Sequence, residues 1–201
     1  MKIAIDLNDV IRDYTMNFAK NYCKEYNKGF DLTDVEFWTN DLSAVLPFKT
    51  DRAYEKFTYE DFVYEIFYKA PTMSTNLSVE LNEWYDKVVK NIETDEPIEV
   101  MIVSTMEYGL SIQCTLTFLS KIGCRFREYY FPVDSTTIWE KCDVLITANP
   151  LLLDSKPDNK KSIKIKTDYN DDKNADFTFS TLSVFLKNEN NILKLIENNG
   201  E

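Results

Sequence analysis

The chain has 201 residues, of which 44% are hydrophobic and 14% aromatic, and its formal net charge at pH 7 is −11. This length suits one domain, or a core with a small insertion, and the apolar content excludes a disordered protein. The negative charge argues against nucleic-acid binding, which needs a basic surface, and against contact with anionic membranes. The same charge repels a phosphorylated substrate unless a metal ion or local cations offset it.

Two absences narrow the chemistry and the location. The sequence contains no histidine, which excludes histidine-based acid–base catalysis, Ser-His-Asp and Cys-His pairs and histidine-bound metals. The opening MKIAIDLNDV lacks the apolar stretch of a signal peptide. No segment approaches the ~18–20 apolar residues of a membrane span. We therefore expect a cytoplasmic protein.

Apolar periodicity predicts one short strand and three helical segments in the first half of the chain. The strand ends in an acidic residue, and the helices are amphipathic, with aromatic residues along one side. The predicted elements are a strand over 2–6, a helix over 10–26, an irregular segment over 28–50, a helical segment over 51–70 and a helix over 77–92.

The second half alternates between strands and helices. The predicted elements are a strand over 98–103, a helix over 109–122 that ends at Gly123, a strand over 125–131, a short helix over 136–141, a strand over 143–147, a weaker strand over 162–166 and a closing helix over 180–196. Such alternation is typical of an α/β protein whose parallel sheet is covered on both faces.

Polar residues stand where the predicted strands end. They are Asp6, Ser104, Thr105 and Thr147. Ligands of open parallel sheets bind beyond the carboxyl ends of the strands, so these four residues are candidates for one site. The alternative is that buried strands must end in polar loop residues in any case, and the sequence leaves both interpretations open.

Three segments resemble the motifs of the haloacid dehalogenase (HAD) superfamily, in particular its 5′(3′)-nucleotidase-like branch. The segment IAIDLNDVIRD, residues 3–13, is similar to the first motif, and the strand that ends in Ser104 is similar to the second. The segment DVLITANP, residues 143–150, resembles the last motif, and the residues around 169–170 resemble the end of the fifth strand.

The resemblance implies a Rossmann-like three-layer HAD core with a parallel sheet and a small helical cap inserted after the first strand. Residues 1–14 and 86–201 correspond to the core, and residues 15–85 to the cap. It also implies that Asp6 is the nucleophile and a Mg²⁺ ligand, and that Ser104 and Thr105 bind the phosphoryl group.

The motifs depart from the family pattern at the catalytic positions. Asn8 stands where the family carries its general acid. An amide cannot donate and recover a proton in catalysis near neutral pH, and that role is worth ~10²–10⁴ in rate. Thr147 and Ala148 stand where the family carries the carboxylates that complete the Mg²⁺ site, so we expect Asp6 to hold Mg²⁺ weakly.

The lysine of the third motif is also missing from its place. Residues 92–120 contain neither lysine nor arginine, and Lys141 precedes its strand and lies at the wrong end of it. Arg12 and Lys166 are the nearest substitutes, although both are expected on the surface.

Two hypotheses follow. The first is a HAD-like protein with a degenerate phosphatase site, weakly active or inactive, which binds a small phosphorylated molecule or a protein partner. The second is a Mg²⁺-dependent, 5′-nucleotidase-like phosphohydrolase with Asp6 as nucleophile; metal-independent displacement on the same scaffold is a third possibility. The aromatic-rich segment 54–68 is either a partner surface or the core of the cap. The oligomeric state is left open.

Overall fold

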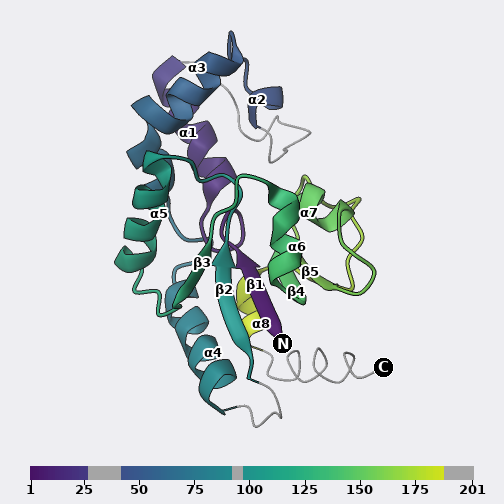
Figure 1. The fold of residues 1–201 in the computed structure, drawn as a ribbon. Helices are drawn as coiled ribbons and strands as arrows, with labels where there is room; N and C mark the ends of the chain where they lie inside the picture. The colour runs from purple at the N-terminus through teal and green to yellow at the C-terminus, as the bar shows by residue number, and fades with distance from the viewer. Residues whose placement is uncertain (27–41, 92–96, 188–201) are drawn as a thin grey trace.

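A six-stranded parallel sheet forms the centre of the computed structural model, which describes residues 1–26, 42–91 and 97–187 (Figure 1). Its strand order is β3-β2-β1-β4-β5-β6, and every adjacent pair is parallel. The strands are β1 (Lys2–Asp6), β2 (Glu99–Val103), β3 (Glu128–Tyr130), β4 (Val144–Thr147), β5 (Lys161–Ile165) and β6 (Phe177–Phe179). The predicted Rossmann-like α/β fold is confirmed.

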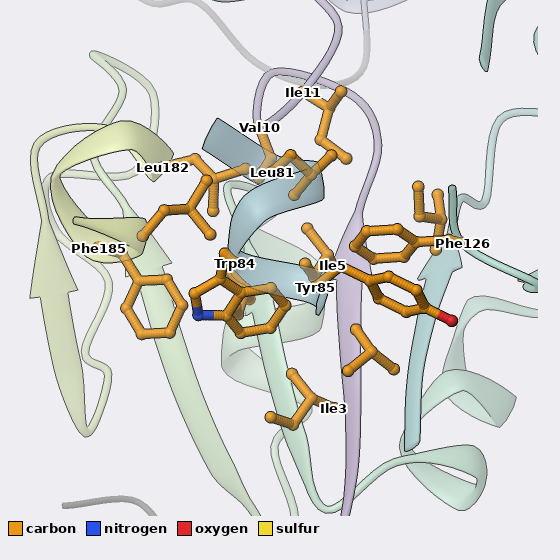
Figure 2. Close-up of a cluster of buried hydrophobic side chains, with 14 of the residues drawn as sticks. Ile3, Ile5, Val10, Ile11, Leu81, Trp84, Tyr85, Phe126, Leu182 and Phe185 are labelled. Atoms are coloured by element: carbon orange, nitrogen blue, oxygen red, sulfur yellow. The ribbon is translucent and has the colours of Figure 1, made fainter. Parts of the chain in front are cut away.

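Helices cover both faces of the sheet because alternate side chains of each strand point to opposite sides. On one face, Ile3 and Ile5 pack in a cluster with Trp84, Phe118 and Phe185, part of which Figure 2 shows. These aromatic residues come from α4 (Leu77–Asn91), α5 (Leu110–Lys121) and α8 (Leu182–Leu186). The other face, which includes Ala4 and Leu145, is covered by η3 (Ser135–Thr137), α6 (Ile138–Lys141) and α7 (Pro150–Asp154).

A second apolar cluster forms mostly within residues 14–68, part of the segment expected to be the cap and called the cap below, and also includes Cys114 of α5. Tyr14, Phe18 and Tyr22 of the first cap helix pack against Phe57 and Phe67. The cap elements are α1 (Tyr14–Tyr26), α2 (Leu42–Val45), α3 (Asp51–Lys56) and the π-helical turns η1 (Phe57–Asp61) and η2 (Tyr64–Tyr68). They lie beyond the carboxyl ends of the strands (Figure 1). The expected cap range runs to residue 85, whereas α4 packs on the sheet from Leu77 onward.

The boundaries of several elements differ from the prediction. The helix expected from residue 10 begins at Tyr14, because residues 7–12 form a turn in which Asp9 has a φ of 57°. The segment 51–70 is helical but includes two π-helical turns, and α2 lies in the stretch expected to be irregular.

The second half also differs in places. The strand predicted over 125–131 is reduced to β3, and neither α7 nor β6 was predicted. The closing helix is seen as α8; residues 188–196 of the predicted helix, like 28–41 of the irregular segment, lie outside the described residues. Across the described segments, every helix is too short or too polar to cross a bilayer.

Candidate functional site

The site forms where β1, β2 and β4 end side by side. Asp6 is the last residue of β1, is only 4% exposed, and accepts a hydrogen bond of 2.6 Å from the hydroxyl of Thr147 at the end of β4. Strands β2 and β3 lie on one side of β1, and strands β4, β5 and β6 lie on the other side. The strand order therefore switches direction between β1 and β4, and ligands of such sheets bind at this switch point. Asp6 and Thr147 were both predicted at this edge, and the structure brings them into contact.

Burial controls the protonation of Asp6. Desolvation raises the pKa of its carboxyl group from 3.8 to about 7, while the hydrogen bond from Thr147 partly opposes this rise. The negative charges of Glu107 and Asp9 raise the pKa further, and the backbone N–H of Leu7 lowers it. Burial therefore favours the protonated carboxyl, although a carboxylate nucleophile must be ionised to react.

Asn8 is held in a hydrogen-bond network. Its side-chain oxygen Oδ1 accepts from Nε and Nη2 of Arg12, at 3.0 and 2.6 Å. Its Nδ2 donates to the hydroxyl of Ser104 at 3.1 Å. Ser104 itself is fully buried, so in this conformation its hydroxyl faces Asn8 rather than a ligand.

Arg12 is fully buried, and the prediction that it lies on the surface was wrong. A guanidinium group has five N–H donors, and all five are used within the protein. Nε and one N–H of Nη2 donate to Asn8, and the other N–H of Nη2 donates to Glu107 Oε1 at 2.6 Å. Nη1 donates to the backbone oxygen of Phe67 at 3.0 Å and to the hydroxyl of Thr115 at 2.8 Å. Arg12 therefore has no donor left for a phosphoryl group.

The Arg12 contacts join the cap to the core. Phe67 belongs to η2 of the cap, whereas Thr115 lies on α5 and Glu107 in the loop after β2. Glu107 is 5% exposed, and its second oxygen has no hydrogen-bond partner within the described part of the chain. Burying such an ion pair costs desolvation energy, which its mutual attraction and the hydrogen bonds of Arg12 must offset.

Asp9 has a structural position beside this network. Its carboxylate accepts hydrogen bonds from the backbone N–H groups of Tyr14 and Thr15, at 3.0 and 2.9 Å, and from the hydroxyl of Thr15. The hydroxyl of Tyr169 donates to it at 2.7 Å. These bonds cap the start of α1. Burial raises the pKa of Asp9, and these hydrogen bonds partly oppose the rise.

The remaining basic candidates lie elsewhere. Lys166 is exposed, as predicted, with Nζ 3.8 Å from a carboxylate oxygen of Asp171. Lys164 is buried, a position that the sequence analysis did not identify. Its Nζ donates to the backbone oxygens of Asn170, Asp171 and Lys173, at 3.1, 3.4 and 2.6 Å. It therefore holds the loop that carries Tyr169 and is not directed at a ligand.

The cavity at the site measures about 20 Å³. It is lined by Asp6, Asn8, Asp9, Tyr14, Thr105, Met106, Asn149 and Tyr169. A single water requires a cavity of ~10–15 Å³, and pockets for small molecules are usually ~300–1,000 Å³. Of the two predicted phosphate ligands, only Thr105 lines the cavity. In this conformation the site admits one water or one small ion.

The donors at the site do not fit Mg²⁺ well. Magnesium prefers six oxygen ligands in octahedral geometry, usually including one or two carboxylates. Thr147 donates its proton to Asp6, and Ala148 offers no side-chain oxygen. Among the described residues, three or more acidic, cysteine or histidine side chains nowhere gather into a group that could hold a metal. The described residues therefore do not supply the ligand set that Mg²⁺ prefers.

Similar folds occur in HAD hydrolases. A haloacid dehalogenase-like hydrolase from Burkholderia xenovorans LB400 aligns with a TM-score of 0.59 at 9% identity, covering 96% of this chain and 97% of its own. The structure of the HAD hydrolase YfnB from Bacillus subtilis, which is bound to magnesium and reveals interdomain movement, aligns with a TM-score of 0.55 at 12% identity. The alignment covers 92% of this chain and 96% of the YfnB chain.

A HAD-superfamily hydrolase of subfamily IA from Geobacter sulfurreducens gives a TM-score of 0.53 at 9% identity, covering 100% of this chain and 96% of its own. No family model and no curated protein matches the sequence significantly. At these identities the structural likeness establishes a HAD-like fold.

Proposed function

We propose that this chain is a HAD-fold protein without effective phosphatase chemistry, and that it acts by binding a protein partner rather than a small phosphorylated molecule. The observation that carries the proposal is the use of every Arg12 donor within the protein, together with the Asn8 amide that it holds. Phosphoryl transfer depends on positioned charge, and the free cation that this needs is missing from the described part of the site.

The environment of Asp6 supports the same conclusion. An ionised nucleophile here would have Asp9 and Glu107 as nearby negative charges, and a phosphate would add more. Like unit charges at ~4 Å repel by ~4 kcal/mol at an effective dielectric of 20. The 20 Å³ cavity also leaves no room for a phosphate ester while the cap is closed. A protein surface, in contrast, can be recognised without entry into this cavity.

A phosphatase assay tests the proposal. Wild type and Asp6→Asn are compared on p-nitrophenyl phosphate and nucleoside monophosphates, with and without Mg²⁺. We expect the two proteins to show the same background rate in every condition. Circular dichroism spectra of both establish that the variant is folded, and Asp171→Asn, an exposed carboxylate, is the matched control.

A Mg²⁺-dependent rate that Asp6→Asn abolishes and Asp171→Asn retains would overturn the proposal. That result would establish the alternative, a 5′-nucleotidase-like phosphohydrolase in which Asp6 is the nucleophile. The cap would then have to open far enough to admit substrate, and the Arg12 contacts would have to break in each cycle.

A further inference from the structure

The outer face of α5 is unusual for so acidic a chain. Residues 108–120 carry no charged side chain, although 28% of all residues are charged. The inner side of α5 packs on the cap and the core, whereas Leu110, Gln113, Leu116, Thr117 and Ser120 are exposed. Leu110 is 51% exposed and Leu116 is 42% exposed. Figure 1 shows α5 at the outer edge of the molecule, below the cap helices.

A hollow of about 490 Å³ lies at the N-terminal end of α5. Tyr59, Tyr108 and Leu110 form its apolar part, with Arg52, Glu55 and Glu60 at its rim. Tyr108 is 69% exposed and makes an edge contact with the Tyr59 ring, with 6.1 Å between centroids. An exposed tyrosine beside an apolar hollow with a charged rim is typical of an interface core.

The two ends of α5 differ in charge. At the N-terminal end, the two carboxylates of Glu55 and Glu60 share one guanidinium group, that of Arg52, at 3.6 and 2.8 Å. The residues that line the hollow therefore carry one excess negative charge.

At the other end, the ammonium groups of Lys69 and Lys121 lie over the rings of Tyr64 and Tyr68, at 4.9 and 5.0 Å from the centroids. Only one carboxylate, that of Glu65, pairs with Lys69 in the described structure, at 3.3 Å. This end therefore has one excess positive charge, and the two ends are complementary to each other.

We propose that a second copy of this chain docks on the outer face of α5, with the two α5 helices antiparallel about a two-fold axis. A two-fold interface uses the same surface on both subunits. The antiparallel arrangement brings the acidic hollow of each copy to the Lys69–Lys121 end of the other, next to Leu116. Two chains of charge −11 repel over most of their surfaces, and this uncharged face avoids that repulsion. The inference does not depend on whether the site at Asp6 is active.

Sedimentation equilibrium of the full chain over a wide range of concentrations tests this interface. We expect wild type to approach twice its 23.6 kDa mass. Leu116→Glu, which places a charge on the face of each copy, should raise the dissociation constant at least about tenfold. Leu151→Glu is the matched control, because Leu151 is 62% exposed on α7, away from α5.

A charge-reversal pair tests the antiparallel orientation. Lys121→Glu should weaken the dimer, and the double variant Glu55→Lys, Lys121→Glu should restore it, because the signs at both ends are then exchanged. If wild type stays at the monomer mass at every concentration, the proposal is overturned, and the outer face of α5 is then a candidate surface for a different protein. A dimer that Leu151→Glu breaks and Leu116→Glu leaves intact would also overturn it. Unchanged thermal melts establish that the variants are folded.

Discussion

Replacing Asp6 by asparagine should stabilise the protein at alkaline pH. The folded-state pKa of this carboxyl is about 7, against an ordinary value of 3.8. Between these values the folded protein holds a proton that the unfolded chain has lost, so stability falls as the pH rises through this range. At 1.36 kcal/mol for each pKa unit, the buried negative charge costs about 4 kcal/mol once the pH exceeds the folded pKa.

An asparagine mimics the protonated carboxyl and removes this cost. Urea unfolding should show Asp6→Asn more stable than wild type above about pH 8, by up to about 4 kcal/mol, with much less difference below about pH 4. Asp9 is present in both proteins, so the difference reports the Asp6 carboxyl together with its repulsion by Asp9. The exposed control Asp171→Asn should show no such gain. A variant that is less stable than wild type at alkaline pH would refute the argument that Asp6 is buried without a compensating cation.

Three further substitutions test contacts around the site and the backbone that follows α5. Arg12→Met leaves the Glu107 charge buried and unpaired and should lower the free energy of unfolding in urea by about 3–5 kcal/mol. The double variant Arg12→Met, Glu107→Met should lower it less, and equal losses in the single and double variants would contradict this. Tyr169→Phe removes the hydroxyl that donates to Asp9 and should cost about 1–3 kcal/mol by the same measurement, and no loss would show that the bond is unimportant. Gly123→Ala should cost about 1 kcal/mol in thermal unfolding, because φ is 69° there, and a stabilised variant would contradict the assigned backbone.

The sequence predicts the meeting of Asp6 and Thr147 because parallel strands end at one edge of a sheet. Each residue closes a β-branched apolar strand that is recognisable without tertiary information. The same reasoning identifies the order of β1, β2, β4 and β5 along the chain. It does not identify β6, which has three residues and lies at the edge of the sheet.

The role of Arg12 could not be predicted in the same way. Arginine is usually exposed, and its partner Glu107 lies 95 residues away in a loop without periodicity. Only the folded chain brings that loop, η2 and α5 around one guanidinium group. Asn8 shows the same limit, because the resemblance to the HAD motif implies that Asn8 replaces an acid but does not imply that the amide bridges Arg12 and Ser104.

The aromatic segment 54–68 divides between the two interpretations left open by the sequence. Phe57, Ile66 and Phe67 are buried in the cap cluster, whereas Tyr64 is 46% exposed beside α5. Helical periodicity alone does not predict which of these side chains are buried, because the two π-helical turns change the spacing at which residues share a face.

A crystal structure of the protein grown with Mg²⁺ and phosphate tests the closed site most directly. We predict a cavity beside Asp6 that holds at most one water, with all five Arg12 donors still bound to Asn8, Phe67, Thr115 and Glu107. An octahedral ion on the Asp6 carboxylate, with a phosphate next to Thr105, would contradict the account and support a Mg²⁺-dependent phosphohydrolase instead.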